Sequence, residues 1–330
     1  MNKDFIKDRD GLNDRLLLFM KKNTSIPFTQ IKQIKHGVWL LSSSNQSWVL
    51  KEFPSKYKLS VQITFSKELK QKGYAQTYSF FPDIFQIDDR IYGLMQYIES
   101  NESGSFHYNS EKNIEVALEA IVQFHTATSK IVPSFIEHLP IFKQLAKWEK
   151  RLVDYFTFIN LHRFNPVYSH LNRLAQYGSW ALQQMQEHKS YFHEEPFCII
   201  HGDVASHNFI KGKNGEVYMI DFDLISIAPP QIDFLQFSNR ILPSLEWNED
   251  RLFSFEKLRH LQNVRPFLAA LVYPTDIFRE WIFYSNSQLE VKSKKWNYVK
   301  QLTFERYKER LAFYERIINI VENNSFPTSK

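Results

Sequence analysis

Cysteine is almost absent from this chain, with Cys198 the only one in 330 residues. A single thiol excludes an intrachain disulfide and a zinc site built from several cysteines. Because it stands in a short apolar run, we expect a small buried side chain. No apolar run approaches the roughly 18 residues of a membrane helix, and the charged N-terminus lacks the apolar core of a signal peptide. We therefore expect a cytoplasmic protein with no membrane partner.

The charge balance is mildly basic, with 41 Lys and Arg against 36 Asp and Glu. This balance suits an anionic nucleotide. No basic stripe with a nucleic-acid-binding motif accompanies it, so we expect no nucleic-acid partner. The chain is 43% hydrophobic and long enough for two lobes with a substantial core. Aromatic residues make up 16% of the chain. This is enough to fill the core with rings and to leave some on a surface that binds a partner.

Three polar residues follow a spacing typical of phosphoryl-transfer sites. Asn208 stands five positions after Asp203, and Asp221 stands thirteen positions after Asn208. In such a site the first Asp accepts a proton from the attacking hydroxyl. The Asn and the second Asp coordinate Mg²⁺, which binds the nucleotide phosphates. The negative charge of these phosphates is stabilised by cations and hydrogen-bond donors. Apolar runs at 198–200 and 217–220, with a turn at 211–215, predict a cradle of short strands around these residues.

Residues 31–53 alternate apolar and polar side chains, as β-strands do, and the chain from Glu111 onward is mostly helical in pattern. Short helices are predicted over residues 12–20 and 59–72. Five strands are predicted, over 31–34, 38–41, 48–53, 79–87 and 91–98. Later helices are predicted over 114–127, 141–161, 168–188, 250–263, 267–272, 276–288 and 296–321.

The segment His201-Gly202-Asp203, with Asn208 behind it, resembles the aminoglycoside phosphotransferase and choline kinase superfamily, which phosphorylates small molecules. This resemblance implies an α+β fold: a two-lobed protein-kinase-like fold with an antiparallel β-sheet N-lobe and a mainly helical C-lobe. The N-lobe would span residues 1–99 and the C-lobe 100–330. Acceptor contacts would come from a helical insert at about 130–190.

The same resemblance assigns roles to residues of the N-lobe. Lys51 would clamp the ATP phosphates, and Glu68 on the following helix would pair with it. The run 94–99 would be the hinge, with Met95 or Tyr97 lining an adenine pocket. An ordinary surface lysine and glutamate, and an ordinary edge strand, are the alternatives for these assignments.

Further residues are expected to support the catalytic loop. Asp233 would brace it through backbone hydrogen bonds, and His201 would be structural. Asp223 would add metal or loop support, or else face solvent or have a capping role. His125 is interpreted as a core histidine that binds no ligand.

The sequence also departs from the kinase pattern. Kinases lay glycines over the phosphates, where backbone N–H groups must stay accessible. In the first hairpin, residues 35–39, Gly37 is the only glycine, and His36 and Trp39 would crowd the phosphates. Ala205-Ser206-His207 stands where the family usually has His-Pro-Gly. The first departure predicts modest nucleotide affinity, and the second leaves the geometry of the catalytic loop open.

Three longer segments resemble one branch of the superfamily, the CotS- and YutH-like spore-coat-associated kinase-like proteins. These are HGDVASHNF, IDFDLIS and PPQIDFLQFSNRILP. The resemblance implies synthesis in the mother cell, location in the spore coat and coat-protein partners. Two interpretations remain: an Mg²⁺- and ATP-dependent phosphotransferase acting on a small-molecule hydroxyl, or a catalytically weak structural coat protein of the same fold.

Overall fold

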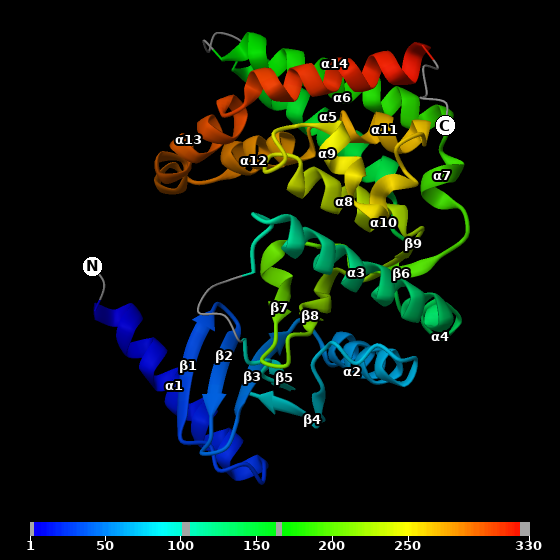
Figure 1. Ribbon diagram of the computed structural model, residues 1–330. Coiled ribbons are helices and arrows are strands. Elements are labelled where there is room, and N and C mark those ends of the chain that lie inside the picture. The colour runs from blue at the N-terminus through cyan, green and yellow to red at the C-terminus, as the bar shows by residue number, and fades with distance from the viewer. Residues whose placement is uncertain (1–2, 101–105, 163–166, 324–330) are drawn as a thin grey trace. The chain divides into compact units, whose positions relative to one another are not determined.

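The computed structural model describes residues 3–100, 106–162 and 167–323 (Figure 1). They pack as two compact units, each described separately. The first contains Met1–Phe106 and His207–Phe222, and the second contains His107–Ser206 and Asp223–Lys330. The chain therefore enters the first unit a second time, four residues after Asp203, and leaves it directly after Phe222.

The first unit is built on a five-stranded antiparallel sheet, as predicted. The strand order is β1-β2-β3-β5-β4. Register pairs Lys51 on β3 with Val38 on β2 and Gly93 on β5, so Lys51 lies in the middle of the sheet. The strands are β1 Gln30–Lys35, β2 Val38–Ser42, β3 Ser47–Phe53, β4 Phe80–Ile87 and β5 Arg90–Gln96.

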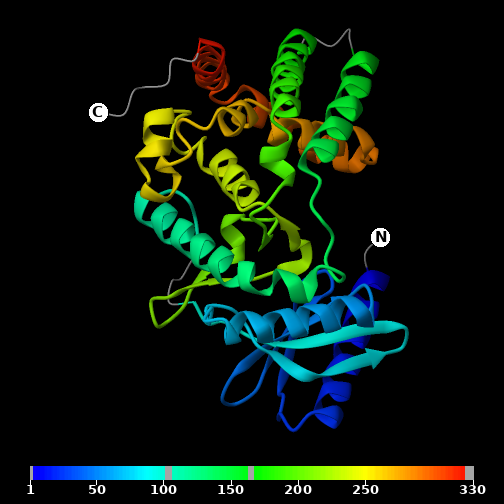
Figure 2. The same ribbon diagram turned by 90° about the vertical axis from the view of Figure 1, so that its right-hand side faces the viewer.

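Two helices pack on this sheet, and they correspond to the two segments of the N-lobe for which the sequence predicts helices. Helix α1 spans Lys3–Asn23, and its Leu16 and Met20 are fully buried in a cluster with sheet residues. Helix α2 spans Lys56–Gln71 and begins at Ser55, whose side chain accepts from the backbone N–H of Lys58. Figure 2 shows α2 running along the sheet beside the β4–β5 hairpin. Each helix buries one apolar face, which is how a two-layer lobe excludes water.

The short strands predicted around the motif are present, and they belong to different units. Strands β7 (Phe209–Lys211) and β8 (Val217–Met219) form a hairpin in the first unit. Strand β6 (Cys198–Ile200) lies in the second unit, paired with β9 (Ser226–Ala228), which the sequence did not predict. The Cys198 side chain is 2% exposed, and burial raises the pKa of its thiol.

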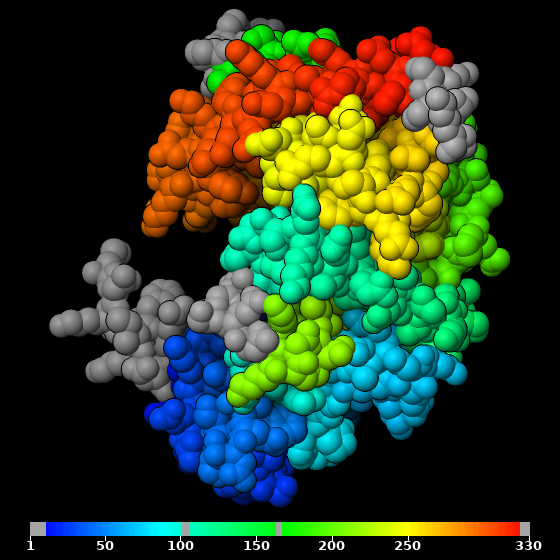
Figure 3. All heavy atoms as spheres, viewed as in Figure 1, coloured from blue at the N-terminus to red at the C-terminus, as the bar shows by residue number. Residues whose placement is uncertain are grey.

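The second unit is mainly helical and buries many stacked rings, such as Trp148 against Tyr273 with centroids 4.1 Å apart. In Figure 3 the surface of this unit includes α3, in teal, α9 and α10, in yellow, and α13 and α14, in orange and red. The longer helices are α3 Glu111–Thr128, α5 Gln144–Leu161, α6 Tyr168–Glu187, α8 Gln231–Ile241, α12 Thr275–Asn286, α13 Leu289–Phe304 and α14 Tyr307–Asn323. The shorter ones are α4 Val132–Phe135, α7 Ser190–His193, α9 Glu249–Ser254, α10 Glu256–Arg259 and α11 Arg265–Leu271.

Two predicted helices are broken in the structure. The segment 250–263 holds α9 and α10, and the last predicted helix, 296–321, is divided between α13 and α14. The second break falls at Arg306, whose φ of 54° lies in the left-handed region. A helix cannot continue through that conformation. No helix within the described ranges is long and apolar enough to cross a membrane.

Candidate active site

Asp221 is the centre of a charged cluster in the first unit. Nζ of Lys51 donates to its Oδ1 at 2.7 Å, and Nζ of Lys35 donates to its Oδ2 at 3.3 Å. Lys51 comes from the middle of the sheet and Lys35 from the end of β1, beside the first hairpin turn. The structure thus brings together Lys51 and Asp221, which lie 170 positions apart in sequence. Lys35 was not predicted.

The charge of this carboxylate is fixed by its neighbours. Burial alone would raise the pKa of Asp221, but the ammonium groups of Lys51 and then Lys35 outweigh it and lower the pKa from 3.8 to about 2. Because the folded-state pKa is the lower one, the cluster stabilises the fold above roughly pH 4, by on the order of 2 kcal/mol. That contribution is lost as the pH falls towards about 2.

Local packing holds Asp221 in place. Its φ of 69° is left-handed, a conformation that costs energy in most residues but that Asp tolerates. The next residue, Phe222, is fully buried against Phe65 of α2 and Tyr78, with centroids 5.2 and 5.4 Å away. This anchor ties the carboxylate to the sheet and helix of the first unit.

Asn208 belongs to the same unit as Asp221. It is 3% exposed, and its carbonyl accepts from the N–H of Ile220, 3.0 Å away, so the two predicted metal ligands flank one hairpin. Asp203 lies in the other unit, and its convergence with them stays a prediction.

Glu68 does not pair with Lys51 in this structure. Its side chain is partly exposed on α2, and no ion pair joins the two among the described residues. The buried face of α2 carries Gln62, Phe65 and Leu69. The assigned lysine is bonded to Asp221 instead.

The first hairpin differs from the expectation that Trp39 crowds the phosphates. Trp39 is 1% exposed, and its indole Nε1 donates to Oδ1 of Asn13 on α1, so the ring belongs to the core beneath α1. His36 is exposed at the turn. Gly37 has a φ of 71°, and its carbonyl accepts from the N–H of Glu52 at 2.8 Å. The turn therefore needs its glycine, and Trp39 does not obstruct it.

The predicted hinge borders an open cavity of about 370 Å³ in the first unit. Tyr97 lines the cavity, and the buried Met95 does not. Further lining comes from the β2–β3 turn and the β7–β8 hairpin. Adenine binding by either residue stays a prediction.

In the second unit, Asp233 on α8 holds the loop that carries Asp203. Its carboxylate accepts from the backbone N–H of His201 at 2.7 Å and of Gly202 at 3.0 Å, and bonds Nε2 of His125 at 2.9 Å. Burial would raise the pKa of Asp233, but the bonds from His125 and His201 outweigh it and hold the pKa below its usual range. His125 is a buried histidine held by Asp233, which agrees with its interpretation as a core residue.

A steric constraint explains why position 202 of the motif is a glycine. Gly202 has a φ of 77°, and a Cβ placed on it would lie 2.4 Å from the carbonyl oxygen of Leu224. Any side chain would push two backbone segments apart.

Gly202→Ala should therefore lower the free energy of unfolding by at least about 2 kcal/mol, because a steric clash is added to left-handed strain. Gly215→Ala is the matched control, since Gly215 has a φ of 83° but nothing within 4 Å of the added Cβ. Chemical denaturation of both variants measures the difference. Equal losses would show that the clash with Leu224 is not a constraint.

Asp203 is contacted by a residue that sequence reasoning missed. Nη2 of Arg240 donates to its Oδ1, and both side chains are about one-third exposed, at 31% for Arg240 and 29% for Asp203. Arg240 follows Asp233 by seven residues, so both lie on one face of α8, a signal that the sequence contained. Asp223 is exposed.

Comparisons with known proteins agree with this architecture. The chain is similar over 94% of its length to an aminoglycoside phosphotransferase from Alicyclobacillus acidocaldarius, covering 96% of that structure with 13% identity and a TM-score of 0.73. A spectinomycin phosphotransferase solved with ADP and spectinomycin has 12% identity and a TM-score of 0.60, with 93% of this chain and 97% of that one covered.

A choline kinase from Streptococcus pneumoniae has 13% identity and a TM-score of 0.50, with coverage of 93% and 99%. At such identities the likeness shows the kinase-like fold alone. A search of curated protein sequences gave no match. The model of the phosphotransferase enzyme family matches residues 31–267, well over half of the chain. The protein therefore belongs to the phosphotransferase enzyme family.

Proposed function

We propose that this protein transfers the γ-phosphoryl group of ATP to the hydroxyl of a small molecule. The observation that carries the proposal is the partly buried Asp221 carboxylate, held ionised between Lys51 and Lys35. A metal-bound nucleotide requires cations for its phosphates and an anion for its metal. The ammonium groups of Lys51 and Lys35 supply the cations, and the carboxylate of Asp221 supplies the anion.

The residues of the first unit fit a magnesium nucleotide. Among the described residues no group of three or more His, Cys, Asp or Glu side chains could hold a metal alone. Mg²⁺ usually takes one or two protein oxygens together with substrate phosphates. Asp221 and Asn208 would supply these oxygens. When bound, Mg²⁺ neutralises charge on the phosphates.

The transfer step assigns one role to each remaining residue. The acceptor hydroxyl attacks the γ-phosphorus, a new oxygen–phosphorus bond forms, and the bond from that phosphorus to the departing ADP oxygen breaks. The hydroxyl proton passes to the carboxylate of Asp203, whose Oδ1 is oriented by Arg240. Lys51 would hold the phosphates in place.

Lys35 is expected to replace donors that a glycine-rich loop would otherwise supply. Lys35→Met should weaken MgATP binding about tenfold, because one charge-assisted contact to phosphate is lost. Lys32→Met removes the same charge from an exposed position on the same strand and is the control. Calorimetric titration measures the affinity of both variants for MgATP. Equal dissociation constants for Lys35→Met and Lys32→Met would show that Lys35 does not contact the nucleotide.

The proposed activity is tested by following ATP consumption with and without Mg²⁺. We expect slow turnover to ADP that requires Mg²⁺ and stops in the Lys51→Met variant. Turnover that persists in that variant, or in excess EDTA, would point to a contaminating enzyme and contradict the proposal.

We also propose the spore coat as the location, on the strength of the sequence resemblance. A structural coat protein with weak nucleotide binding is the second candidate function. It is favoured by the engagement of both Asp221 oxygens by lysines, which a metal would have to displace. Fractionation of spores with an antibody to this protein tests the location. Recovery solely outside the coat would contradict it.

A further inference from the structure

Four cationic side chains of the second unit lie close enough to act on one another, and two of them, Lys147 and Arg240, also act on Asp203, the residue expected to accept the hydroxyl proton. Two come from α5, one from α8 and one from α12. We call them the cationic cluster: Lys147, Arg151, Arg240 and Arg279.

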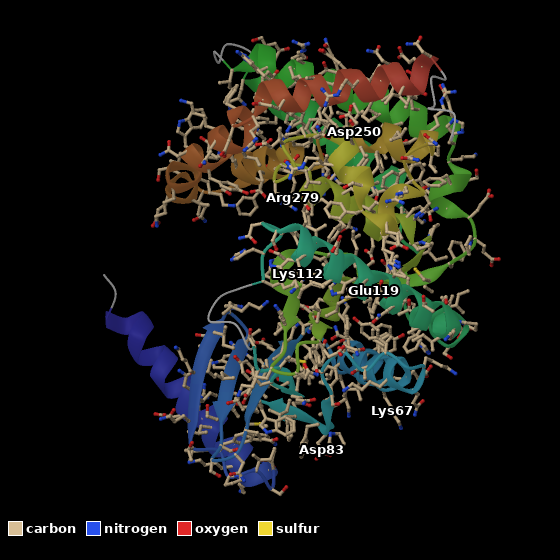
Figure 4. The ribbon with its side chains drawn as sticks, in the orientation of Figure 1. Lys67, Asp83, Lys112, Glu119, Asp250 and Arg279 are labelled. Atoms are coloured by element: carbon tan, nitrogen blue, oxygen red, sulfur yellow. The ribbon has the colours of Figure 1, made fainter. Side chains whose placement is uncertain are left out.

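Contacts between α5 and α12 bring three of these charges together. Lys147 and Arg151 stand four residues apart, so they share one face of α5. Nη1 of Arg151 donates to Oγ1 of Thr275, 2.5 Å away, at the start of α12. Arg279, labelled in Figure 4, follows Thr275 by four residues on the same face of α12. Two like charges four residues apart, as Lys147 and Arg151 are on α5, destabilise a helix. The stability of the fold therefore does not explain why both residues are cationic.

Arg240 joins this group through Asp203, which it contacts directly. Burial lowers the pKa of Lys147, Arg151 and Arg240, and the positive charge of Arg279 lowers each of these pKa values further. The carboxylate of Asp203 opposes this effect for Lys147 and Arg240. Lys147 nevertheless keeps exposed surface, so it is crowded by protein and still accessible to a solute.

Nearby carboxylates do not balance the cationic cluster. Asp276 is occupied by Arg310, whose two guanidinium nitrogens lie 2.9 and 2.8 Å from its oxygens. Glu280 accepts from Arg279 at 3.0 Å but also binds Lys295 at 3.5 Å.

Two members have no carboxylate partner among the described residues. Lys147 lies over the ring of Phe142, 4.7 Å from its centroid, and Arg151 bonds only Thr275. Cations without a carboxylate partner, clustered with the Arg240 that contacts Asp203, indicate an anionic ligand, since phosphate and carboxylate groups match the guanidinium donors.

We propose that the phosphoryl acceptor is an organic anion, a hydroxyl compound carrying a phosphate or carboxylate group that the cationic cluster binds. This inference rests on the proposed function, because it makes Asp203 the base towards that acceptor. Cationic acceptors, such as aminoglycosides or choline, would be repelled at this position.

The test compares three sugars that differ in charge, with the full-length protein saturated with MgADP so that nucleotide phosphates are already in place. Glucose 6-phosphate should bind at least about tenfold more tightly than glucose or glucosamine, because only it offers an anion to the cationic cluster. Gluconate in a parallel titration separates a carboxylate preference from a phosphate preference. Calorimetry gives the dissociation constants.

Variants separate specific binding from general charge. Lys147→Ala and Arg279→Ala should each weaken glucose 6-phosphate about tenfold. Lys150→Ala is the matched control on α5, where Lys150 is exposed and paired with Asp154. Its affinity should equal that of the wild type.

Two results would overturn the inference: glucosamine binding as tightly as both anions, or Lys147→Ala and Arg279→Ala binding like Lys150→Ala. Failure of MgADP to bind would instead count against the proposed function. The charge preference of the second unit can then still be measured without nucleotide.

Discussion

Asp203→Ala is expected to lower phosphoryl transfer by about 10²–10⁴-fold, the usual contribution of a positioned base. Nucleotide affinity should remain close to that of the wild type, because Asp203 belongs to the acceptor side of the reaction. Rates of ADP formation and calorimetric titration of MgATP measure the two effects on the same preparation.

The control for this variant is Asp250→Ala. Asp250 is an exposed aspartate on α9 in the same unit, labelled in Figure 4. Thermal unfolding shows whether the loss of the contact with Arg240 disturbs the fold. A wild-type rate in folded Asp203→Ala protein would exclude this residue as the base.

Asp221→Ala should remove the Mg²⁺ dependence of nucleotide binding. The variant deletes the carboxylate that Lys51 and Lys35 both contact, and with it the expected main metal ligand. We expect the affinity measured with Mg²⁺ to fall to the value measured in EDTA. Stability should also fall above roughly pH 4, since the depressed pKa of Asp221 stabilises the folded state there.

Asp83→Ala is the control in the first unit, because Asp83 is exposed on β4 (Figure 4). Should Asp221→Ala keep a Mg²⁺-dependent gain in affinity equal to that of Asp83→Ala, another group must hold the metal.

Local patterns predicted much of the fold. The five strands of the sheet were predicted because alternation along a half-buried strand is visible in sequence. The break between α13 and α14 was missed because Arg306 adopts a left-handed conformation without glycine or proline to signal it. Strand β9 was missed because its pairing with β6 is a long-range contact that no local pattern records.

Sequence reasoning proposed site residues where these share a motif and proposed none where they do not. Asp203 and Asp221 follow from spacing, whereas Lys35 lies 186 positions from Asp221 and Arg240 lies 37 from Asp203. Trp39 was assigned to the phosphate loop because its neighbours in sequence are there, but its side chain points to α1. Such errors follow from the direction of a side chain, which sequence alone does not fix.

The most direct test of the proposed nucleotide site is calorimetric titration of MgADP into the wild-type protein, repeated in EDTA and with Lys51→Met. The site formed by Asp221, Lys51 and Lys35 predicts one binding site that weakens at least about tenfold in EDTA and in the variant. No binding of MgADP, or binding indifferent to both Mg²⁺ and Lys51, would contradict the assignment of this site to a nucleotide.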